Sequence, residues 1–277
     1  MKADLHTHTI ESDGVLTREA LFQKAKEKGL DYLAITDHDV CRHVEKNRRL
    51  GEKYGVKYIP GIELSTLYQD KSVHILGYFR DESYRAEAME EYYVMIREGR
   101  ENRAKKFIEN LKEHFGIVIT YEEVFKQSDG IIARPHIARA IIAKYPEYTH
   151  DDVFDKFLGN DSPAYVPSTE LSVQEGLKLL KDHNALAVLA HPVLLNDEIH
   201  DAILEYPFDG IEAKYPMNTP RDTALYTALA KSRNLLITAG SDYHGHANDA
   251  SHGELGSTTI KDESLERFLE ALKPYTP

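Results

Sequence analysis

Short apolar runs alternate along residues 1–79 with segments in which apolar residues recur at helical spacing. The segment 17–28 carries its apolar residues on one face, with Thr17 suited to begin a helix and Gly29 suited to end it. A second helix is expected over 44–54. Strands are expected at Lys2–Leu5, Tyr32–Thr36, Tyr58–Glu63 and Val73–Tyr78. This β-α-β order predicts a parallel sheet or a barrel.

The alternation breaks at the end of the fourth expected strand. The segment 81–115 is charged and helical in its pattern, either as one long helix or as two helices joined near Gly99. Nothing in the following stretch indicates a buried parallel strand. We therefore interpret 80–165 as a helical insertion or cap, between a first barrel part at 1–79 and a second at 166–277. Its shorter helices are expected at Tyr121–Lys126, Pro135–Lys144 and His150–Leu158.

The alternation of helices and strands resumes after the insertion. Helices are expected at Val173–His183, Arg221–Ser232 and 263–272. Strands are expected at Ala187–Ala190, Gly210–Ala213, Leu235–Ala239 and 258–260. The whole pattern predicts an α/β protein whose sheet or barrel is interrupted by a helical cap.

The charge balance narrows the possible partners. The chain of 277 residues has 34 Lys and Arg against 46 Asp and Glu, a formal charge of −12. A clamp for duplex DNA needs a broad basic face, so that class is not expected. An anionic substrate remains compatible with this charge if bound metal ions supply positive charge locally. The sequence carries no signal for an oligomeric state.

Two further features bear on location. A membrane span needs roughly 20 consecutive apolar residues, and the chain contains no such run. The polar start Lys2–Asp4 does not resemble a signal peptide, and the single cysteine, Cys41, fits a reducing compartment. We expect no membrane association and a cytoplasmic location, with Cys41 serving in packing.

The histidines and acids are placed in an informative way, because they follow the expected strands. His6 and His8 lie two residues apart, which on a strand projects both side chains to one side, and Asp242 and His244 repeat that spacing. The ends of parallel strands share one face, where α/β active sites lie. Nine candidate metal ligands would meet there: His6, His8, Asp13, His38, Glu63, His74, His191, Asp242 and His244.

Each motif alone has an ordinary explanation. A His-x-His string is a weak signal, and Asp13-Gly14 by itself is a turn. Together, six imidazoles and three carboxylates in one cleft would be costly without a compensating cation. Imidazole and carboxylate ligands suit Mn, Fe or Zn.

Nine ligands exceed the roughly four to six that one ion takes, so two or three divalent ions sharing a bridging carboxylate are expected. Three divalent ions would carry about +6 against the −3 of the acids, which suits a phosphate ester.

The strings at these positions resemble the PHP (polymerase and histidinol phosphatase) superfamily over nearly the whole chain. They are His6-Thr7-His8, Ser12-Asp13-Gly14, Thr36-Asp37-His38-Asp39, Pro60-Gly61-Ile62-Glu63, His74, Ala190-His191-Pro192 and Gly240-Ser241-Asp242-Tyr243-His244. The resemblance implies a distorted (βα)7 TIM-like barrel with a trinuclear site. It implies one metal on His6, His8, Glu63 and Asp242, a second on Asp13, His38 and His244, and a third on His74, His191 and a bridging Glu63.

The insertion points to a branch of that superfamily. Its strings Ile132–Ala138 and Pro163–Pro167 resemble the PHP phosphoesterases that act on nucleoside 3′,5′-bisphosphates and on the 5′ ends of short RNA. That resemblance implies that Arg134 and His136 contact substrate phosphate. Independently, Pro135 suits the first turn of a helix, which would place Arg134 at its positive end. The alternative is that both are surface residues flanking a helix start.

One departure from the branch is the string Asn184-Ala185, where a glycine pair is common before the strand that leads to His191. It puts the local turn in question rather than the ligands. Histidinol-phosphate phosphatases usually carry a different string after the first His-x-His, so that branch is a weaker alternative.

The expected reaction is hydrolysis of a phosphate monoester or diester of a nucleotide or short oligonucleotide, with a metal-bridging hydroxide as nucleophile. His191, Asp242 and His136 are the candidate catalytic residues, and His136 or a metal-bound water would protonate the leaving group. Two other classes stay open: a non-catalytic, metal-bound structural or regulatory module, and an amidohydrolase.

Tyr215 is interpreted as a packing residue or a base-stacking one, and His252 as a surface or structural residue.

Overall fold

A single sheet organises the computed structural model, which describes residues 1–128, 132–159, 161–166, 171–246 and 251–274. Its strands run in the order β8-β7-β6-β4-β3-β2-β1-β9, and β5 pairs with β3 beside that path. The sheet curves into a nearly closed barrel. The strands are β1 (Lys2–Asp4), β2 (Tyr32–Ile35), β3 (Lys57–Tyr68), β4 (Lys71–Phe79), β5 (Leu171–Ser172), β6 (Ala185–Leu189), β7 (Gly210–Lys214), β8 (Leu236–Ala239) and β9 (Ile260–Lys261).

Ten α-helices surround or extend this sheet in the described part of the chain. They are α1 (Arg18–Glu27), α2 (Val44–Tyr54), α3 (Glu87–Phe115), α4 (Tyr121–Phe125), α5 (Arg134–Lys144), α6 (His150–Val153), α7 (Val173–Asp182), α8 (Asp197–Leu204), α9 (Pro220–Ser232) and α10 (Asp262–Ala271). Thr17 caps α1 as expected, since its side chain accepts a hydrogen bond from the Ala20 amide at 3.3 Å. None of these helices is long and apolar enough to cross a bilayer.

The parallel direction indicated by the β-α-β alternation does not extend to β4. The strands β1, β2 and β3 are mutually parallel, and so are β6, β7 and β8, but β4 runs antiparallel to both β3 and β6. The cause is the tight turn at Gln69 and Asp70, whose φ values of 49° and 61° form a two-residue hairpin connection. The terminal strand β9 is also antiparallel, to β1.

The helical segment after β4 forms one long helix rather than two. α3 continues through Gly99 to Phe115, and a short 3-10 helix, Glu82–Arg85, precedes it. After α6 the chain forms one turn of π-helix at Phe154–Leu158. The sequence pattern did not predict α8, β5 or the 3-10 turn Pro192–Leu194.

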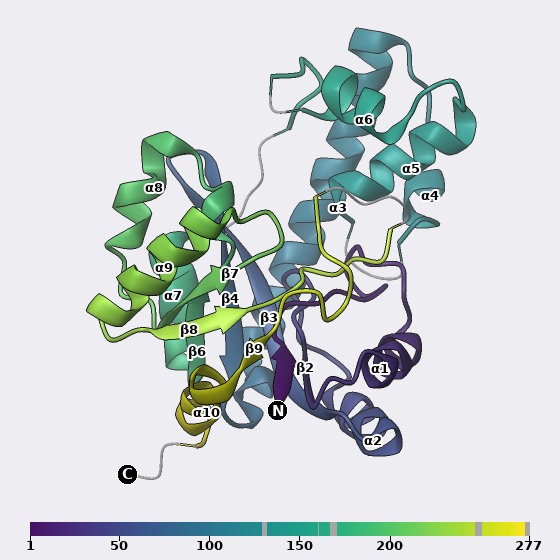
Figure 1. Cartoon of the computed structure of the whole chain (residues 1–277). Coiled ribbons are helices and arrows are strands. Elements are labelled where there is room, and N and C mark those ends of the chain that lie inside the picture. Colours follow the sequence, from purple (N-terminus) through teal and green to yellow (C-terminus); the bar gives the residue numbers. More distant parts are fainter. Residues whose placement is uncertain (129–131, 160, 167–170, 247–250, 275–277) are drawn as a thin grey trace.

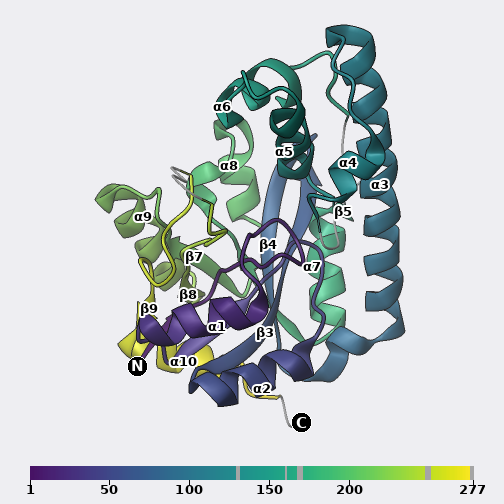
Figure 2. The same cartoon turned by 90° about the vertical axis from the view of Figure 1, so that its right-hand side faces the viewer.

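Two separate hydrophobic clusters divide α3. Its first half packs Met89 and Tyr92 into the cluster of the sheet and α7, and its second half packs Phe107 and Leu111 against α5 and the π-helix. In Figures 1 and 2, α4, α5 and α6 stand beyond one end of the sheet, and α3 runs from beside the sheet up to them. We therefore propose that the insertion 80–165 is a cap with its own core, rooted on the barrel through α3.

Asn184 takes the place of the glycine pair that the related branch commonly has before β6. Its φ of 51° is left-handed, a conformation that asparagine tolerates better than most residues with a side chain. Its carboxamide donates to an Asp81 oxygen at 2.7 Å and accepts from Arg80 Nη1 at 3.3 Å. The turn before β6 is therefore made without a glycine.

Candidate metal centre

All nine predicted ligands lie at the same end of the barrel, although not all for the predicted reason. His6 and His8 follow β1, His38 follows β2 and His191 follows β6, as the sequence indicated. Glu63 lies inside β3, which continues to Tyr68, and pairs with His38 through an isolated bridge.

The other corrections concern His74, Asp242 and His244. His74 lies near the beginning of β4, and the antiparallel direction of that strand brings it to the shared end. Asp242 has a left-handed φ of 51° beyond β8, so it and His244 converge through a turn rather than through strand alternation.

Glu63 stands at the centre of the cluster. Its Oε2 lies 3.2 Å from His6 Nε2, His8 Nε2 and His38 Nδ1. Its other oxygen, Oε1, lies 2.9 Å from His74 Nδ1 and 3.1 Å from His191 Nε2. Because each oxygen faces a different set of imidazoles, Glu63 would offer a ligand atom to each set if metal ions were bound there.

The remaining two acids complete separate sets. Asp242 Oδ1 lies 3.2 Å from His6 Nε2 and 3.1 Å from His8 Nε2. Asp13 Oδ1 lies 3.1 Å from His244 Nε2. The geometry supports four overlapping ligand groups: His6, His8, Glu63 and Asp242; His8, Asp13, His38 and His244; His38, Glu63 and His74; and Asp242, His244 and His252.

These groups can be compared with the sets that the resemblance implies. The first two contain the implied ligands, and the second adds His8. The third has His38 where the resemblance places His191, whose Nε2 lies 3.3 Å from His74 Nδ1. The fourth contains His252, which the sequence analysis treated as surface or structural.

The facing ligand atoms fit bound cations. Six of them are buried and have no hydrogen-bond partner among the described residues, namely His6 Nε2, His8 Nε2, His38 Nδ1, Asp13 Oδ1, Glu63 Oε2 and Asp242 Oδ1. Buried polar atoms are normally satisfied, so a group of unpartnered imidazole nitrogens and carboxylate oxygens facing one another fits a site for cations.

The shifted pKa values in the cluster also fit a cation site. Burial raises the pKa of Asp13, Glu63 and Asp242, yet the surrounding imidazoles hold all three well below the usual range. Burial lowers the pKa of His8, but the neighbouring Asp242 and Glu63 carboxylates prevail and raise it to about 10. Burial lowers the pKa of His38 to about 4. The carboxylates are therefore ionised, and without metal ions protons on imidazoles balance part of their charge.

Three further buried carboxylates hold predicted ligands or the backbone beside them, and none of the three was among the predicted site residues. Glu212 on β7 is fully buried, its Oε1 lies 3.1 Å from His6 Nδ1, and its Oε2 accepts from the His191 amide at 2.8 Å. Asp37 accepts from the Thr9 amide, and Asp4 from the Ser241 amide. An acid inside an apolar strand, as in Gly210–Lys214, was the available signal for Glu212.

Two aromatic residues extend the Asp242 side of the centre. The Tyr215 hydroxyl donates to Asp242 Oδ2 at 2.9 Å, so this tyrosine orients a predicted ligand. The His252 ring lies 4.2 Å from the His244 ring, between centroids, and its Nε2 lies 3.7 Å from Asp242 Oδ2.

The predicted substrate residues lie at the start of α5 in the cap. Pro135 occupies the first turn of that helix, as expected, and Arg134 Nη1 donates to the Leu158 carbonyl at 3.2 Å. His136 is buried, and its Nδ1 accepts from the Ala133 amide at 2.8 Å. Burial, and then the charge of Arg139, lower the pKa of His136 to about 4. Substrate contact by Arg134 and His136 stays a prediction.

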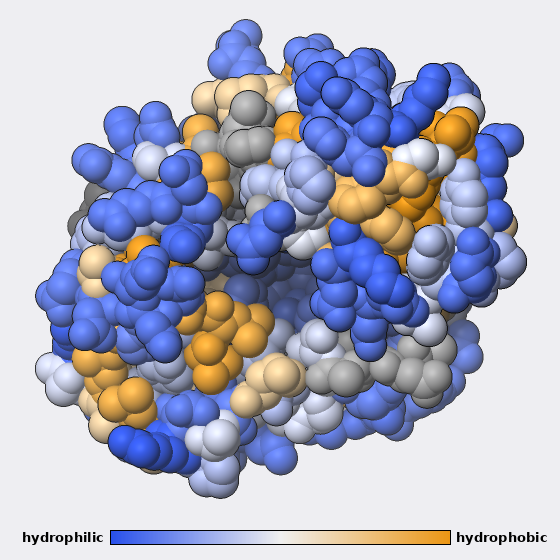
Figure 3. Space-filling model, turned by 90° about the horizontal axis from the view of Figure 1, so that it is seen from above, coloured by the Kyte–Doolittle hydropathy of each residue, from blue (hydrophilic) through white to orange (hydrophobic). Residues whose placement is uncertain are grey.

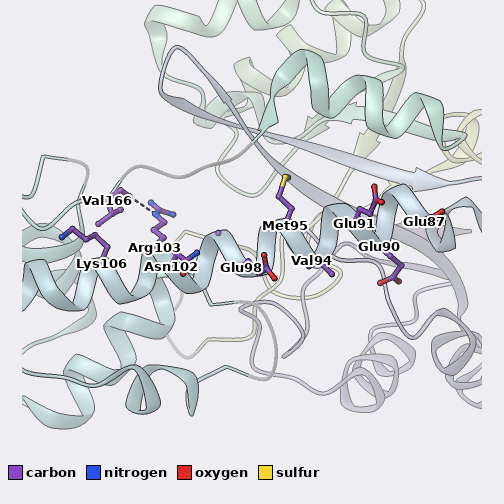
Figure 4. Close-up of a pocket in the computed structure, with 11 residues that line it drawn as sticks. Glu87, Glu90, Glu91, Val94, Met95, Glu98, Asn102, Arg103, Lys106 and Val166 are labelled. Carbon is purple, nitrogen blue, oxygen red and sulfur yellow. Dashed lines mark hydrogen bonds between the residues drawn. The ribbon is translucent and has the colours of Figure 1, made fainter.

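The molecule is hollowed on the face toward which the cap projects, and hydrophilic residues line much of the hollow (Figure 3). A separate open groove of about 890 Å³ runs along α3, where Val94, Met95 and Arg103 contribute to its wall (Figure 4). None of the nine predicted ligands lines that groove, so we assign no part of the metal chemistry to it.

Cys41 is buried in the barrel core, which confirms its packing role.

Comparison with known proteins identifies the family. Residues 4–148 match the PHP domain. The chain belongs to the PHP domain family. It is 31% identical over 250 residues to the 5′-3′ exoribonuclease Rnm of Escherichia coli (strain K12), covering 87% of this chain and 84% of that protein. It is 28% identical to the 3′,5′-nucleoside bisphosphate phosphatase of Chromobacterium violaceum, covering 91% of each protein.

A solved structure agrees. The chain matches a protein from Bifidobacterium adolescentis that is described as a metal-dependent phosphoesterase, at 30% identity and a TM-score of 0.85, covering 97% of this chain and 96% of that one. The PHP resemblance, the α/β fold with a TIM-like barrel and the class of metal-dependent phosphoric ester hydrolase are confirmed. Divalent metal binding is supported by the ligand cluster, whereas the number and identity of the ions stay predictions.

Proposed function

We propose that this PHP protein hydrolyses phosphate esters of nucleotides, with a nucleoside 3′,5′-bisphosphate or a short 5′-phosphorylated oligonucleotide as substrate. The observation that carries the proposal is the position of Glu63, whose two oxygens are shared among five imidazoles. The substrate class is supported by the relatives, an exoribonuclease and a bisphosphate phosphatase.

The nine predicted ligands would hold two or three divalent ions, with Mn, Fe and Zn as the candidates that imidazole and carboxylate donors favour. Bound ions would activate water at neutral pH and neutralise the phosphoryl oxygens. Glu212 fixes the ring of His6, because a carboxylate at Nδ1 leaves Nε2 directed at Glu63 and Asp242. The ligand atoms are thus oriented before any ion binds.

His136 fits the role of a phosphate-binding donor better than that of a general acid. A histidine with a pKa of about 4 is neutral at pH 7, and its Nδ1 accepts from the Ala133 amide. The ring proton therefore resides on Nε2, where it can be donated to a phosphate oxygen. A neutral imidazole is too weak an acid to protonate a leaving group efficiently.

The direct test is a phosphate-release screen with added Mn, Fe or Zn. The panel contains a nucleoside 3′,5′-bisphosphate, a 5′-monophosphate, a short 5′-phosphorylated RNA, histidinol phosphate and an amide. We expect metal-dependent release from the nucleotide substrates, and loss of release in Asp13→Ala and His191→Ala variants that remain folded. Undiminished release by metal-stripped protein would contradict the proposal.

The other outcomes of the screen correspond to the alternatives. Turnover of histidinol phosphate alone would assign the histidinol-phosphate branch, and turnover of the amide alone would assign an amidohydrolase. Tight metal binding without turnover of any substrate would indicate a structural or regulatory module. We also propose a cytoplasmic location, which a nucleotide substrate and the lone buried thiol of Cys41 support.

A further inference from the structure

The cap carries another partly buried cation on the same helix as His136. Arg139 lies on α5 one turn after His136, and the structure leaves it half-buried. Its Nη2 donates to the Gln127 carbonyl at 3.1 Å. Its Nη1 is buried without a hydrogen-bond partner among the described residues. A buried guanidinium donor in that state is complementary to an oxygen acceptor.

Arg139 is coupled electrostatically to two residues that the account already uses. Burial lowers the pKa of Arg139, and the Asp13 carboxylate opposes that shift. The charge of Arg139 also contributes to the low pKa of His136. Arg139 is therefore within electrostatic range of one predicted metal ligand and one predicted phosphate donor, yet no described carboxylate pairs with it at 4.0 Å or less.

Neighbouring arginines of the cap are engaged differently. Arg100 is bound by the Asp39 carboxylate and by Ser65 Oγ. Arg103 donates to the Val166 carbonyl at 2.8 Å. Arg100 and Arg103 thus donate to acceptors of the protein itself, whereas Arg139 Nη1 has no hydrogen-bond acceptor among the described residues.

We propose that Arg139 and His136 form an anion subsite on the cap and that Arg139 contacts a phosphate group of the substrate. This inference rests on the proposed function, since it concerns the substrate of the same centre. A guanidinium with one edge held by the Gln127 carbonyl can offer its other edge to phosphate oxygens. Arg134, by contrast, donates to the Leu158 carbonyl.

The test measures the affinity of the Mn-loaded protein for inorganic phosphate by titration calorimetry, which requires no turnover. Arg139→Gln removes the charge but keeps a donor for Gln127, and we expect phosphate binding to weaken about 10- to 100-fold. Arg139→Lys should restore part of that loss, because lysine keeps the charge without the fork. The matched control is Arg103→Gln, which removes a cap arginine that also donates to a backbone carbonyl and should bind phosphate as the wild type does.

The kinetic arm assigns the phosphate that Arg139 contacts. A loss of kcat/KM confined to the 3′,5′-bisphosphate assigns the non-reacting phosphate, and an equal loss with a 5′-monophosphate assigns the reacting one. Phosphate affinity in Arg139→Gln equal to that of the wild type would overturn the inference, as would absence of phosphate binding by the wild type. The proposed function fails by a different result, namely no metal-dependent phosphate release from any ester.

Discussion

At the scale of single residues, the centre depends on how a few carboxylates divide the imidazoles. Glu63 is almost fully buried and faces His6, His8 and His38 with one oxygen and His74 and His191 with the other. A buried carboxylate in that position is stable only with positive charge on both sides. Bound ions supply that charge more directly than protonated imidazoles do.

The Glu212→Gln variant tests how the ligands are oriented. We expect metal affinity to fall roughly 10- to 100-fold. The glutamine side chain has only one acceptor oxygen, so it cannot accept from both His6 Nδ1 and the backbone N–H of His191. Equilibrium dialysis with Mn measures the change. Glu198→Gln is the control. Glu198 is exposed and pairs with Lys71, so this variant should bind metal as the wild type does. Equal affinities for the two variants would remove Glu212 from the account.

Metal binding should release protons at pH 7. His8 has a pKa of about 10 without ions, above its ordinary 6.5, so it holds a proton that an incoming ion must displace. Calorimetry in two buffers of different ionisation enthalpy measures the release, and metal affinity should rise with pH. Binding without proton release would contradict the assignment of a proton to His8 in the metal-free protein.

The same shift predicts the pH dependence of stability for the metal-free protein. Because the folded pKa of His8 lies above the unfolded value, its contribution is complete below pH 6.5 and is lost as the pH rises through 10. The Tm of the metal-free protein should therefore fall over that range. A Tm that rises between those pH values would contradict this assignment.

The clustering of the nine predicted ligands could be anticipated from the sequence, because imidazole and carboxylate side chains recur after several of the expected strands. Glu212 and Tyr215 could not, since a buried acid or tyrosine acquires its role only from the residue that folding places opposite it. His252 was missed for the same reason, because its proximity to His244 depends on a loop path that sequence spacing does not fix.

At the scale of elements, α3 joins the cap to the barrel through a buried polar network. Arg100 on α3 binds the Asp39 carboxylate, and Asp39 Oδ1 also accepts from the Tyr92 hydroxyl and the Ser65 amide, both at 2.7 Å. Asp39 has a left-handed φ of 57° and directly follows His38. The network thus fixes both the root of the cap and the backbone beside a predicted metal ligand.

Removing one partner of this network should be costly. Arg100→Gln leaves the fully buried Asp39 carboxylate without its cation, and we expect a loss of about 3–5 kcal/mol in the free energy of unfolding. Urea denaturation measures it. Arg48→Gln, which removes an exposed pair with Glu45, should cost less than about 1 kcal/mol. A similar small cost for both variants would show that the network contributes little.

At the scale of the whole molecule, an acidic chain concentrates a cation site at one end of its barrel. The family strings and the alternation of elements were sufficient to predict the TIM-like barrel, whereas the extent of the insertion stays a prediction. The direction of β4 was not predictable from alternation, because the left-handed turn at Gln69 and Asp70 involves no glycine. The relation of cap to barrel also required the structure, because one helix serves two cores.

The most direct measurement is a titration of metal-stripped protein with Mn while phosphate release from a nucleoside 3′,5′-bisphosphate is followed. The account predicts that turnover develops only as two or more ions bind per chain, because Glu63 divides its oxygens between separate ligand groups. Full turnover with a single ion, or with none, would contradict it.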